Sequence, residues 1–442
     1  MLRKSCILIL GTALLFSQAV WAKGTPSSKS STRPASVAPL AKSRVITLDK
    51  ATETALANSS QLKAAAAAMG VSEGEQRQAG ALPNPEFGIE AENIAGQGPY
   101  RGTDSAEMTY GVSQLIEIGG KRSARQEAAN QGHAVAKAEY EGTRLNLIRD
   151  VKIAYAEAVA AKETVALAKK QKSLAAEVLK NVVQRVNAAA EPLFQRSKSE
   201  VALATSEMAL DKAQRDYTTA RRNLAALWNS ENADFDLDSS RFFEIIPSKA
   251  LIQADATKLN PDLRRLGAEE ARRRALLDLE KANAIPDPTV SVGVRDFRES
   301  RQRAFVFGLS IPIPVFNLNR GNIAKAYSEV NKTLSDKQSA EIALSTELAH
   351  NQQELENAYH QAKTLKNTII PAAQKAYELS RQGYQAGKFP YLEVLDAQRT
   401  LVEARAQYND ALRNYHNKRA EVERLTAKYQ PSPDEKEDSH AD

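Results

Sequence analysis

The chain has 442 residues, an apolar fraction of 42% and a charged fraction of 26%, enough for two or three ordinary domains or one elongated one. Its net charge of +6 is small and evenly spread, which argues against a nucleic-acid partner. The only cysteine, Cys6, lies in an N-terminal leader, so the chain without that leader has no disulfide and no cysteine metal site.

The first 22 residues resemble a secretory signal peptide. Arg3 and Lys4 precede an apolar run at 7–20, and Ala22 ends a small-residue cleavage site. The run is too short for a transmembrane helix, and no later apolar run approaches the length of about 18 residues that spans a bilayer. We therefore predict that the chain is exported and cleaved after Ala22.

Two segments lack the pattern of a folded element. Residues 23–43 are rich in Ser, Pro and Lys, and residues 431–442 are acidic. We predict that the first is a flexible lead-in and that the second is a disordered tail.

Between these segments the sequence is internally duplicated, with repeats at 44–247 and 248–430. Each repeat predicts a helix that stops at Pro-x-Pro, a β-hairpin, a very long helix and a returning helix. The predicted elements of the first repeat are a helix at 47–82, a β-hairpin at 85–117 and a helical hairpin at 121–229; those of the second are a helix at 248–284, a β-hairpin at 286–314 and a helical hairpin at 321–429. The long helices, at 121–187 and 321–386, would each extend roughly 100 Å. We expect each shorter helix to stack end to end with a returning one.

The two helical hairpins turn at equivalent positions. AAAEPLF at 188–194 aligns with AGKFPYL at 386–392, so Pro192 precedes Pro390 by 198 residues. Gly387 suits the reversal because glycine readily adopts a left-handed backbone. Its counterpart is Ala189, and we therefore expect the two turns to differ.

The four strand-like runs alternate apolar with polar residues. Strands of about 9–11 residues with one apolar face are typical of an outer-membrane barrel wall, although a half-buried soluble sheet shows the same alternation. The predicted lipid-facing residues are Phe87, Ile89, Tyr110, Val112, Val290, Val292, Phe305, Phe307 and Leu309. The opposite face carries, among others, Glu86, Glu90, Ser291 and Arg295.

Four strands cannot close a barrel, and an open sheet edge in lipid leaves backbone groups unpaired at several kcal/mol each. Three copies would supply twelve strands, enough to enclose a lumen. The predicted fold is therefore mainly α with a small β part. It is an internally duplicated protomer of long coiled-coil helices and two β-hairpins, whose trimer forms a 12-strand outer-membrane β-barrel on an α-helical periplasmic barrel.

Three segments carry a resemblance to a known family: SQLIEIGGKRSAR at 113–125, LSIPIPVFNLNRGNIAKA at 309–326 and YQAGKFPYLEVLDAQRTLVEA at 384–404. With the duplicated plan, they resemble the TolC-type outer-membrane efflux family. LPNPEFGIEAENIAG, with IEIGGKR, further resembles its heavy-metal branch, typified by the cobalt–zinc–cadmium outer-membrane component. The resemblance implies a homotrimer in the outer membrane that extends into the periplasm. It would passively conduct divalent heavy-metal cations from an inner-membrane, proton-driven resistance-nodulation-division pump and a periplasmic adaptor (membrane fusion) protein.

By motif position, the resemblance places Glu393 and Asp396 at a periplasmic constriction, where three copies would form carboxylate rings that attract cations. The alternative is that both are ordinary solvated helix carboxylates. The expected adaptor contacts are the turn residues Ala189, Glu191, Pro192, Gly387, Lys388, Phe389 and Pro390. Some relatives have a basic residue where Phe389 stands, so a basic latch is not expected at that position.

The search for catalytic chemistry finds no Gly-rich phosphate loop, nucleophile elbow or metalloprotease helix, and no two histidines have the i, i+4 spacing of a metal clamp. We predict no enzyme activity, no cofactor and no metal site. Lys121, Arg122 and Arg320 flank the hairpins and are either junction anchors or ordinary surface charges. Two alternatives stay open: a conduit of the same fold for multidrug efflux or type I protein secretion, and a soluble periplasmic coiled-coil interaction protein.

Overall fold

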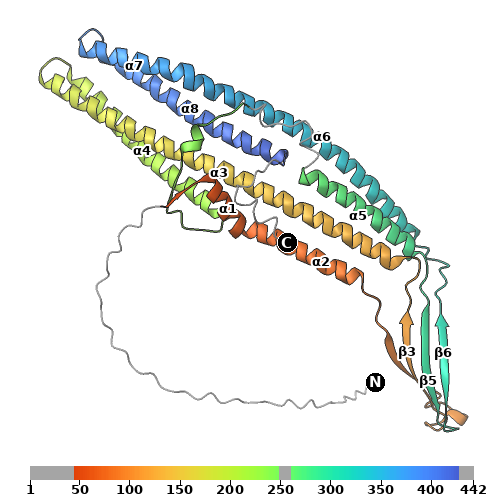
Figure 1. The fold of residues 1–442 in the computed structure, drawn as a ribbon. Coiled ribbons are helices and arrows are strands. Elements are labelled where there is room, and N and C mark those ends of the chain that lie inside the picture. Colours follow the sequence, from red (N-terminus) through yellow and green to blue (C-terminus); the bar gives the residue numbers. More distant parts are fainter. Residues whose placement is uncertain (1–43, 248–259, 428–442) are drawn as a thin grey trace, which may run out of the picture. The chain divides into compact units, whose positions relative to one another are not determined.

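The computed structural model describes residues 44–247 and 260–427 (Figure 1). The predicted signal peptide at 1–22, the lead-in at 23–43, the first part of the second repeat at 248–259 and the tail at 431–442 lie outside the described residues. Within the described ranges, no helix combines the length and the apolarity needed to cross a bilayer.

The fold is mainly helical, with a small β part, and the predicted fold class of the protomer is confirmed. The helices are α1 (Leu48–Asn58), α2 (Ser60–Ala79), α3 (Lys121–Asn187), α4 (Leu193–Ala226), α5 (Pro261–Asn283), α6 (Arg320–Thr364), α7 (Ile370–Gln385) and α8 (Tyr391–Leu425). The strands are β1 (Arg44–Ile46), β2 (Glu86–Glu92), β3 (Glu107–Leu115), β4 (Phe235–Leu237), β5 (Thr289–Phe297) and β6 (Gln302–Ser310).

The long helix α3 organises the helical packing. It contacts α1, α2, α4, α5 and α8, while α6 packs against α5 and α8, and α7 packs against α8. At the end of α4, Asn229 Nδ2 donates to Asn58 O (2.8 Å) and to Ser60 Oγ (2.5 Å). At the equivalent place in the second repeat, Asn260 Nδ2 donates to Leu425 O at 2.9 Å. The shorter and the returning helices therefore meet end to end along the long ones.

One of the predicted continuous helices is broken, and another runs on through a short π-helical segment. The expected helix at 47–82 is split because Ser59, with ψ 126°, is extended and separates α1 from α2. The expected helix at 321–386 contains a π-helical segment, Leu365–Ile369, between α6 and α7. Pro371 follows this segment and has no N–H to continue the i→i−4 pattern, so a wider turn precedes it.

The two hairpin turns share a left-handed backbone at equivalent positions, while their side-chain contacts differ, as described below. Ala189 (φ 55°) and Gly387 (φ 70°) are both left-handed. Ala190 N donates to Arg185 O at 2.8 Å, and Lys388 N donates to Gly383 O at 2.8 Å, the hydrogen bond of a Schellman motif. The turn residue in the first hairpin bears the left-handed cost of roughly 1–2 kcal/mol for a residue with a Cβ.

The two β-hairpins join into one antiparallel sheet in the order β2-β3-β5-β6. Side chains directly opposite one another on neighbouring strands share a face. The register therefore aligns apolar rows across the sheet: Phe87, Val112, Val292 and Phe307 in one row, and Ile89, Tyr110, Val294 and Phe305 in the next. The outer strands β2 and β6 each have one neighbour, so both edges of the sheet are open.

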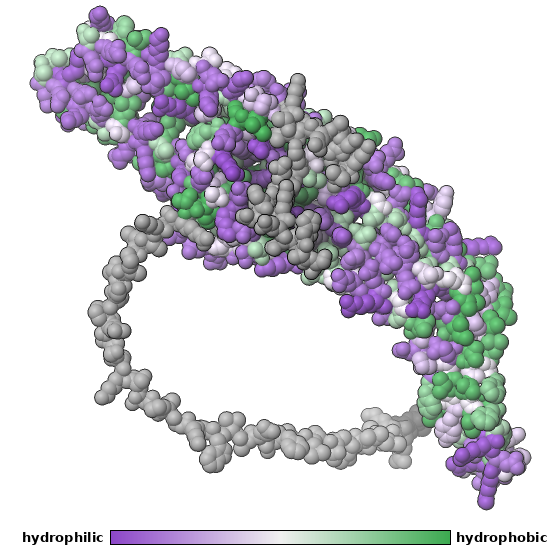
Figure 2. Space-filling model, in the orientation of Figure 1, coloured by the Kyte–Doolittle hydropathy of each residue, from purple (hydrophilic) through white to green (hydrophobic). Residues whose placement is uncertain are grey.

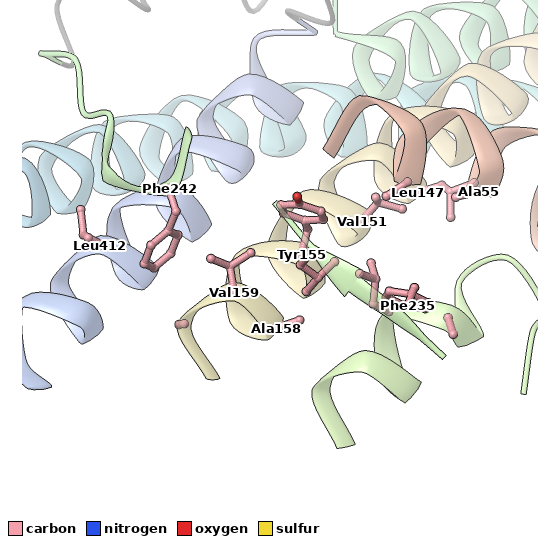
Figure 3. Packing of buried hydrophobic residues seen from close by; sticks show 14 of the residues in the cluster. Ala55, Leu147, Val151, Tyr155, Ala158, Val159, Phe235, Phe242 and Leu412 are labelled. Atoms are coloured by element: carbon pink, nitrogen blue, oxygen red, sulfur yellow. The ribbon is translucent and has the colours of Figure 1, made fainter. Parts of the chain in front are cut away.

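A buried cluster fixes the middle of the helical part (Figure 3). Val151, Val159 and Tyr155 of α3 pack there with side chains from α1, α8 and the segment that contains β4. The Tyr155 hydroxyl contacts Ile46 O at 3.0 Å and Asp238 O at 2.8 Å, which ties the ends of β1 and β4 to α3. This pair of short parallel strands was not predicted.

A histidine beside this cluster makes the stability of the fold depend on pH. His416 stacks on Phe242 and its Nε2 donates to Phe242 O at 2.8 Å. Burial lowers the pKa of His416 below its ordinary value of 6.5, against the effect of that hydrogen bond. Near pH 6.5 the His416 side chain is therefore protonated in the unfolded chain but stays neutral in the folded chain. The free energy of unfolding therefore decreases as the pH falls below that value.

We expect His416→Gln, which can still donate to Phe242 O but does not titrate, to flatten the loss of stability between pH 7 and pH 5.5. The change in slope should be at most one proton, about 1.4 kcal/mol per pH unit. Chemical unfolding of the detergent-solubilised protein at several pH values measures it. His360→Gln is the control, because His360 is exposed, and an equal change in that variant would contradict the assignment.

Candidate functional site

The apolar face of the sheet is exposed in the single chain. The nine predicted lipid-facing side chains range from 43% exposed at Val290 to 78% at Phe307. The apolar surface continues past β6 through Ile313 and Val315 to Phe316, whose side chain is fully exposed, and Figure 2 shows the apolar patch around the strands. An uncovered apolar face of this extent marks a surface that contacts lipid or another chain.

The opposite face of the sheet is polar and contains an ion-pair network. Arg295 donates to Thr109 Oγ1 at 2.9 Å and pairs with Glu92 (2.9 Å) and Glu107 (3.0 Å). On the same face, Glu86 and Glu90 are exposed, and among the described residues neither has an ion pair. This face therefore presents uncompensated negative charge.

A glycine allows the two hairpins to approach each other closely on the polar face. A Cβ on Gly293 would lie 2.7 Å from Tyr110 O and 3.1 Å from the Cα of Gly111, its partner across β3 and β5. Real Cβ atoms are not found at the shorter distance, so a side chain at Gly293 would force the central strands apart.

The junction between sheet and helices depends on Lys121, which is buried. Its Nζ contacts Asp287 Oδ2 at 2.7 Å and Ile285 O at 2.5 Å, and Asp287 Oδ1 accepts from Ile118 N at 2.9 Å. Lys121 therefore ties the start of α3 to the segment that enters β5, and so connects the two repeats.

Two arginines, Arg122 and Arg125, bind the end of α2 beside this junction. Arg125 pairs with Glu117 at 2.5 Å and donates to Ala79 O and Ala81 O, while Arg122 Nε donates to Gly80 O at 2.9 Å. The carbonyl groups at the end of α2, which have no partner within the helix, accept these hydrogen bonds. The hydrogen bond from Arg125 lowers the pKa of Glu117. Lys121 and Arg122 are thus junction residues, whereas Arg320 is exposed and has no ion pair among the described residues.

The two turns at the other end of the helices are closed by different contacts at equivalent positions. In the first turn, Arg185 Nε lies 3.6 Å from Glu191 Oε1. In the second, the corresponding positions hold Gly383 and Phe389, and the Phe389 ring lies against Gly383 where a Cβ would clash. Phe389 remains 48% exposed, so the second turn presents an apolar group where the first presents an ion pair.

The two helical hairpins are also held to each other near these turns. The Arg185 guanidinium lies 4.8 Å from the centre of the Tyr384 ring, a cation–π contact between α3 and α7. Tyr384 in turn packs against Tyr391, with ring centres 5.5 Å apart. Burial raises the pKa of Tyr384, so its hydroxyl stays neutral. On the side of this contact away from the turns, Val182 of α3 packs with residues of α7 and α8. We call Arg185, Glu191 and Tyr384 the mouth cluster.

Glu393 and Asp396 lie on one face of α8, in its first two turns. Both side chains are exposed, and neither has an ion pair among the described residues. The equivalent positions in the first repeat, Gln195 and Lys198, carry no acid. At these two equivalent positions, only the second hairpin therefore carries carboxylates.

The sequence patterns missed the buried role of Lys121 and the mouth cluster. A lysine that starts a helix usually lies in solvent, and the partners of Lys121 are 164 and more residues away in the sequence. Arg185 and Tyr384 belong to different repeats, so no local spacing relates them. The only sequence signal that relates Arg185 to the second hairpin is the internal duplication, which aligns the two turns.

The described residues contain no group of three or more His, Cys, Asp or Glu side chains that could bind a metal ion. Long helical hairpins joined to a small sheet with an exposed apolar face and two open edges define a protomer of a membrane channel. The chain matches the family described as Outer membrane efflux protein over residues 51–230 and 253–428.

The chain is 32% identical to the cobalt-zinc-cadmium resistance protein CzcC of Cupriavidus metallidurans over 86% of this chain and 90% of that one. It is 29% identical to the nickel-cobalt-cadmium resistance protein NccC of Alcaligenes xylosoxydans over 57% of each. The solved outer-membrane channel OprN has the same fold, with a TM-score of 0.73, 18% identity and coverage of 86% of this chain and 89% of that one. The chain therefore belongs to the outer membrane efflux protein family, and it is an outer-membrane efflux channel.

Proposed function

We propose that three copies of the chain close one barrel of twelve strands, which continues as a helical duct into the periplasm. The observation that carries the proposal is the four-stranded sheet, which has one exposed apolar face and an open edge at β2 and at β6. In lipid such edges are too costly to leave unpaired, so each must pair with another chain. The apolar face then contacts lipid, and the polar face with Glu86 and Glu90 lines the lumen.

We further propose that the duct passively conducts divalent heavy-metal cations. The 32% identity to a cobalt-zinc-cadmium resistance protein supports this cargo. The free carboxylates of Glu86, Glu90, Glu393 and Asp396 favour cations along the path. The turns at 188–193 and 386–391 are the proposed contacts for a periplasmic adaptor, and an inner-membrane resistance-nodulation-division pump would supply the driving force.

Deletion of the gene tests the cargo, and the purified protein in planar lipid bilayers tests the channel. We expect the deletion strain to lose tolerance to zinc, cobalt or cadmium while keeping its tolerance to organic drugs. We expect the protein to conduct ions as a trimer. Loss of drug tolerance alone would favour the multidrug alternative, and a monomer that stays soluble without detergent would contradict the channel.

The double variant Glu393→Gln with Asp396→Asn tests the proposed constriction. Three copies would lose six carboxylates from one level of the lumen, so we expect divalent cations to block the monovalent current several-fold more weakly. Titration of the block in planar bilayers measures this effect. Glu200→Gln is the control, because Glu200 is a carboxylate of α4 paired with Arg196 on the other hairpin. Equal block in the double variant and the native protein would remove both residues from the constriction.

A further inference from the structure

We propose that the end of the sheet that lies away from the helices binds the phosphate groups of lipopolysaccharide, the phosphorylated glycolipid of the outer leaflet (Figure 1). The binding residues would be Arg298 and Arg301 of the turn between β5 and β6, with Arg303 beside them. The inference rests on the proposed orientation of the sheet, with its apolar face against lipid, and adds to it a specific lipid partner.

The strands have the length that places this turn at the outer headgroups. β5 and β6 have nine residues each. At a rise of about 3.4 Å per residue and a tilt of about 40°, nine residues cover about 23 Å along the membrane normal, close to the apolar band of about 25 Å of an outer-membrane barrel. In the proposed duct the helices leave the other end of the strands toward the periplasm. The turn between β5 and β6 therefore lies at the headgroups of the outer leaflet.

The apolar face ends in cationic side chains near this turn. Along β6, Phe305 of the apolar face is followed on the same side by Arg303. Along β5, Val294 is the last apolar residue of that face, and Arg298 lies on the same side four positions later. Arg298 keeps the register of the sheet, because its N–H donates to Ala106 O at 3.0 Å. Figure 2 shows the hydrophilic side chains beyond the apolar patch at this end of the strands.

Three arginines line one open hollow at this end of the sheet. The hollow has a volume of about 930 Å³, and Arg298, Arg301 and Arg303 are among its lining residues, all of them exposed. Arg303 pairs with Asp296 at 3.2 Å, whereas Arg298 and Arg301 have no ion pair among the residues that the structure describes. Two guanidinium groups are thus available to bind an anion.

The positions of Arg298 and Arg301 favour a shared anion. Phe297 and Gln302 are the last paired residues of β5 and β6, so the two arginines occupy the next position on either side of the turn. Like charges at opposed positions of two strands repel each other. A bound phosphate would compensate both charges, because each guanidinium group can donate two parallel N–H groups to phosphate oxygens.

The hollow is not simply basic, because Asp104 and Glu299 also line it. Both side chains are exposed, and within the described ranges neither forms an ion pair. The net charge of the hollow therefore does not select an anion. The planar guanidinium fork does, since its geometry matches two oxygens of one phosphate group, which a lysine ammonium cannot reproduce.

Native mass spectrometry of the full-length protein in mild detergent, titrated with lipid A, the phosphorylated anchor of lipopolysaccharide, tests the proposal. We expect bisphosphorylated lipid A to bind at least about tenfold more tightly than lipid A without its phosphates, because hydrogen bonds to charged groups are lost with them. Arg298→Gln with Arg301→Gln should weaken binding of the bisphosphorylated form by a similar factor. Arg298→Lys with Arg301→Lys should give an intermediate loss.

Arg320→Gln is the matched control, because Arg320 is an exposed arginine without an ion pair among the described residues, at the other end of the sheet. It should bind lipid A as the native protein does. Equal affinity of the native protein and the double glutamine variant for bisphosphorylated lipid A overturns the inference. So does equal affinity of the native protein for lipid A with and without phosphates, or tighter binding of phosphatidylglycerol than of lipid A.

Recording of the same preparations in planar bilayers separates this inference from the channel proposal. A protein that conducts ions as a trimer but does not discriminate the phosphates of lipid A overturns the inference alone. A protein that stays monomeric and soluble without detergent overturns both. Normal conductance of the double glutamine variant, together with its weaker binding of lipid A, would show that the fold is intact and would support the proposed site.

Discussion

Lys121→Met is expected to destabilise the folded chain by about 3 kcal/mol, the lower end of the cost of breaking a buried ion pair. Methionine fills the same volume but leaves Asp287 without its cation and Ile285 O without its donor. The side chains of Lys121 and Asp287 are only 10% and 17% exposed, so water compensates poorly. Chemical unfolding of the detergent-solubilised variant measures the loss.

Two further variants make this prediction specific. Arg122→Met removes the neighbouring charge, whose hydrogen bond to Gly80 O is exposed, and should cost at most about 1 kcal/mol. Lys121→Met combined with Asp287→Leu removes both charges and should recover much of the lost stability, because no unpaired charge remains. If the double variant is as unstable as the sum of the single variants, the ion pair is not the cause.

Arg185→Ala is expected to raise the conductance of the channel at rest several-fold. It removes the cation from the Tyr384 ring and the partner of Glu191, and with them the polar contact between the two helical hairpins at the mouth. A cation–π contact that is partly shielded from water contributes about 1 kcal/mol. In the proposed trimer, loss of that energy would shift each copy's hairpins toward a separated arrangement by about fivefold, which sets the expected several-fold rise in conductance.

Single-channel recording in planar bilayers checks this expectation. Arg196→Ala is the matched control, since Arg196 is an arginine of the same hairpin whose pair with Glu200 is exposed and lies within α4. Arg185→Lys keeps the charge but loses the planar stacking on Tyr384, so it should give an intermediate conductance. An unchanged conductance in Arg185→Ala would show that the mouth cluster does not restrain the hairpins.

Much of the architecture followed from patterns that repeat over many residues. The alternation at Phe87 and Ile89 identified a strand face, and the matching turns at Pro192 and Pro390 identified a duplicated hairpin. Each pattern is local and is reinforced by its second occurrence. The joining of the two hairpins through β3 and β5 follows less directly, because the sequence alone does not say which strands become neighbours.

The features that escaped prediction depend on single residues or on distant partners. Ser59 separates two helices at the short polar stretch Asn58–Ser60 inside a longer helical pattern, and the three-residue strands β1 and β4 are too short to show an alternation. Ala189 adopts a left-handed backbone that its residue type disfavours, because the surrounding helices impose the turn. For Glu393 and Asp396, the family resemblance suggested the constriction, and their place in a lumen depends on other copies and stays a prediction.

The pairing of β3 with β5 constrains how the chain can fold. Thr109 and Arg295, bonded across these strands, are 186 residues apart in the sequence, with a pair of long helices between them. Closing so large a loop carries an entropic cost, and contacts of this range form slowly. The edge of β3 in the first hairpin therefore stays unpaired until the second repeat, which contains β5, has been translocated. During that interval the unpaired β3 edge can pair with strands of other chains and aggregate. Correct folding therefore requires the helices to bring the two repeats together before such intermolecular pairing occurs.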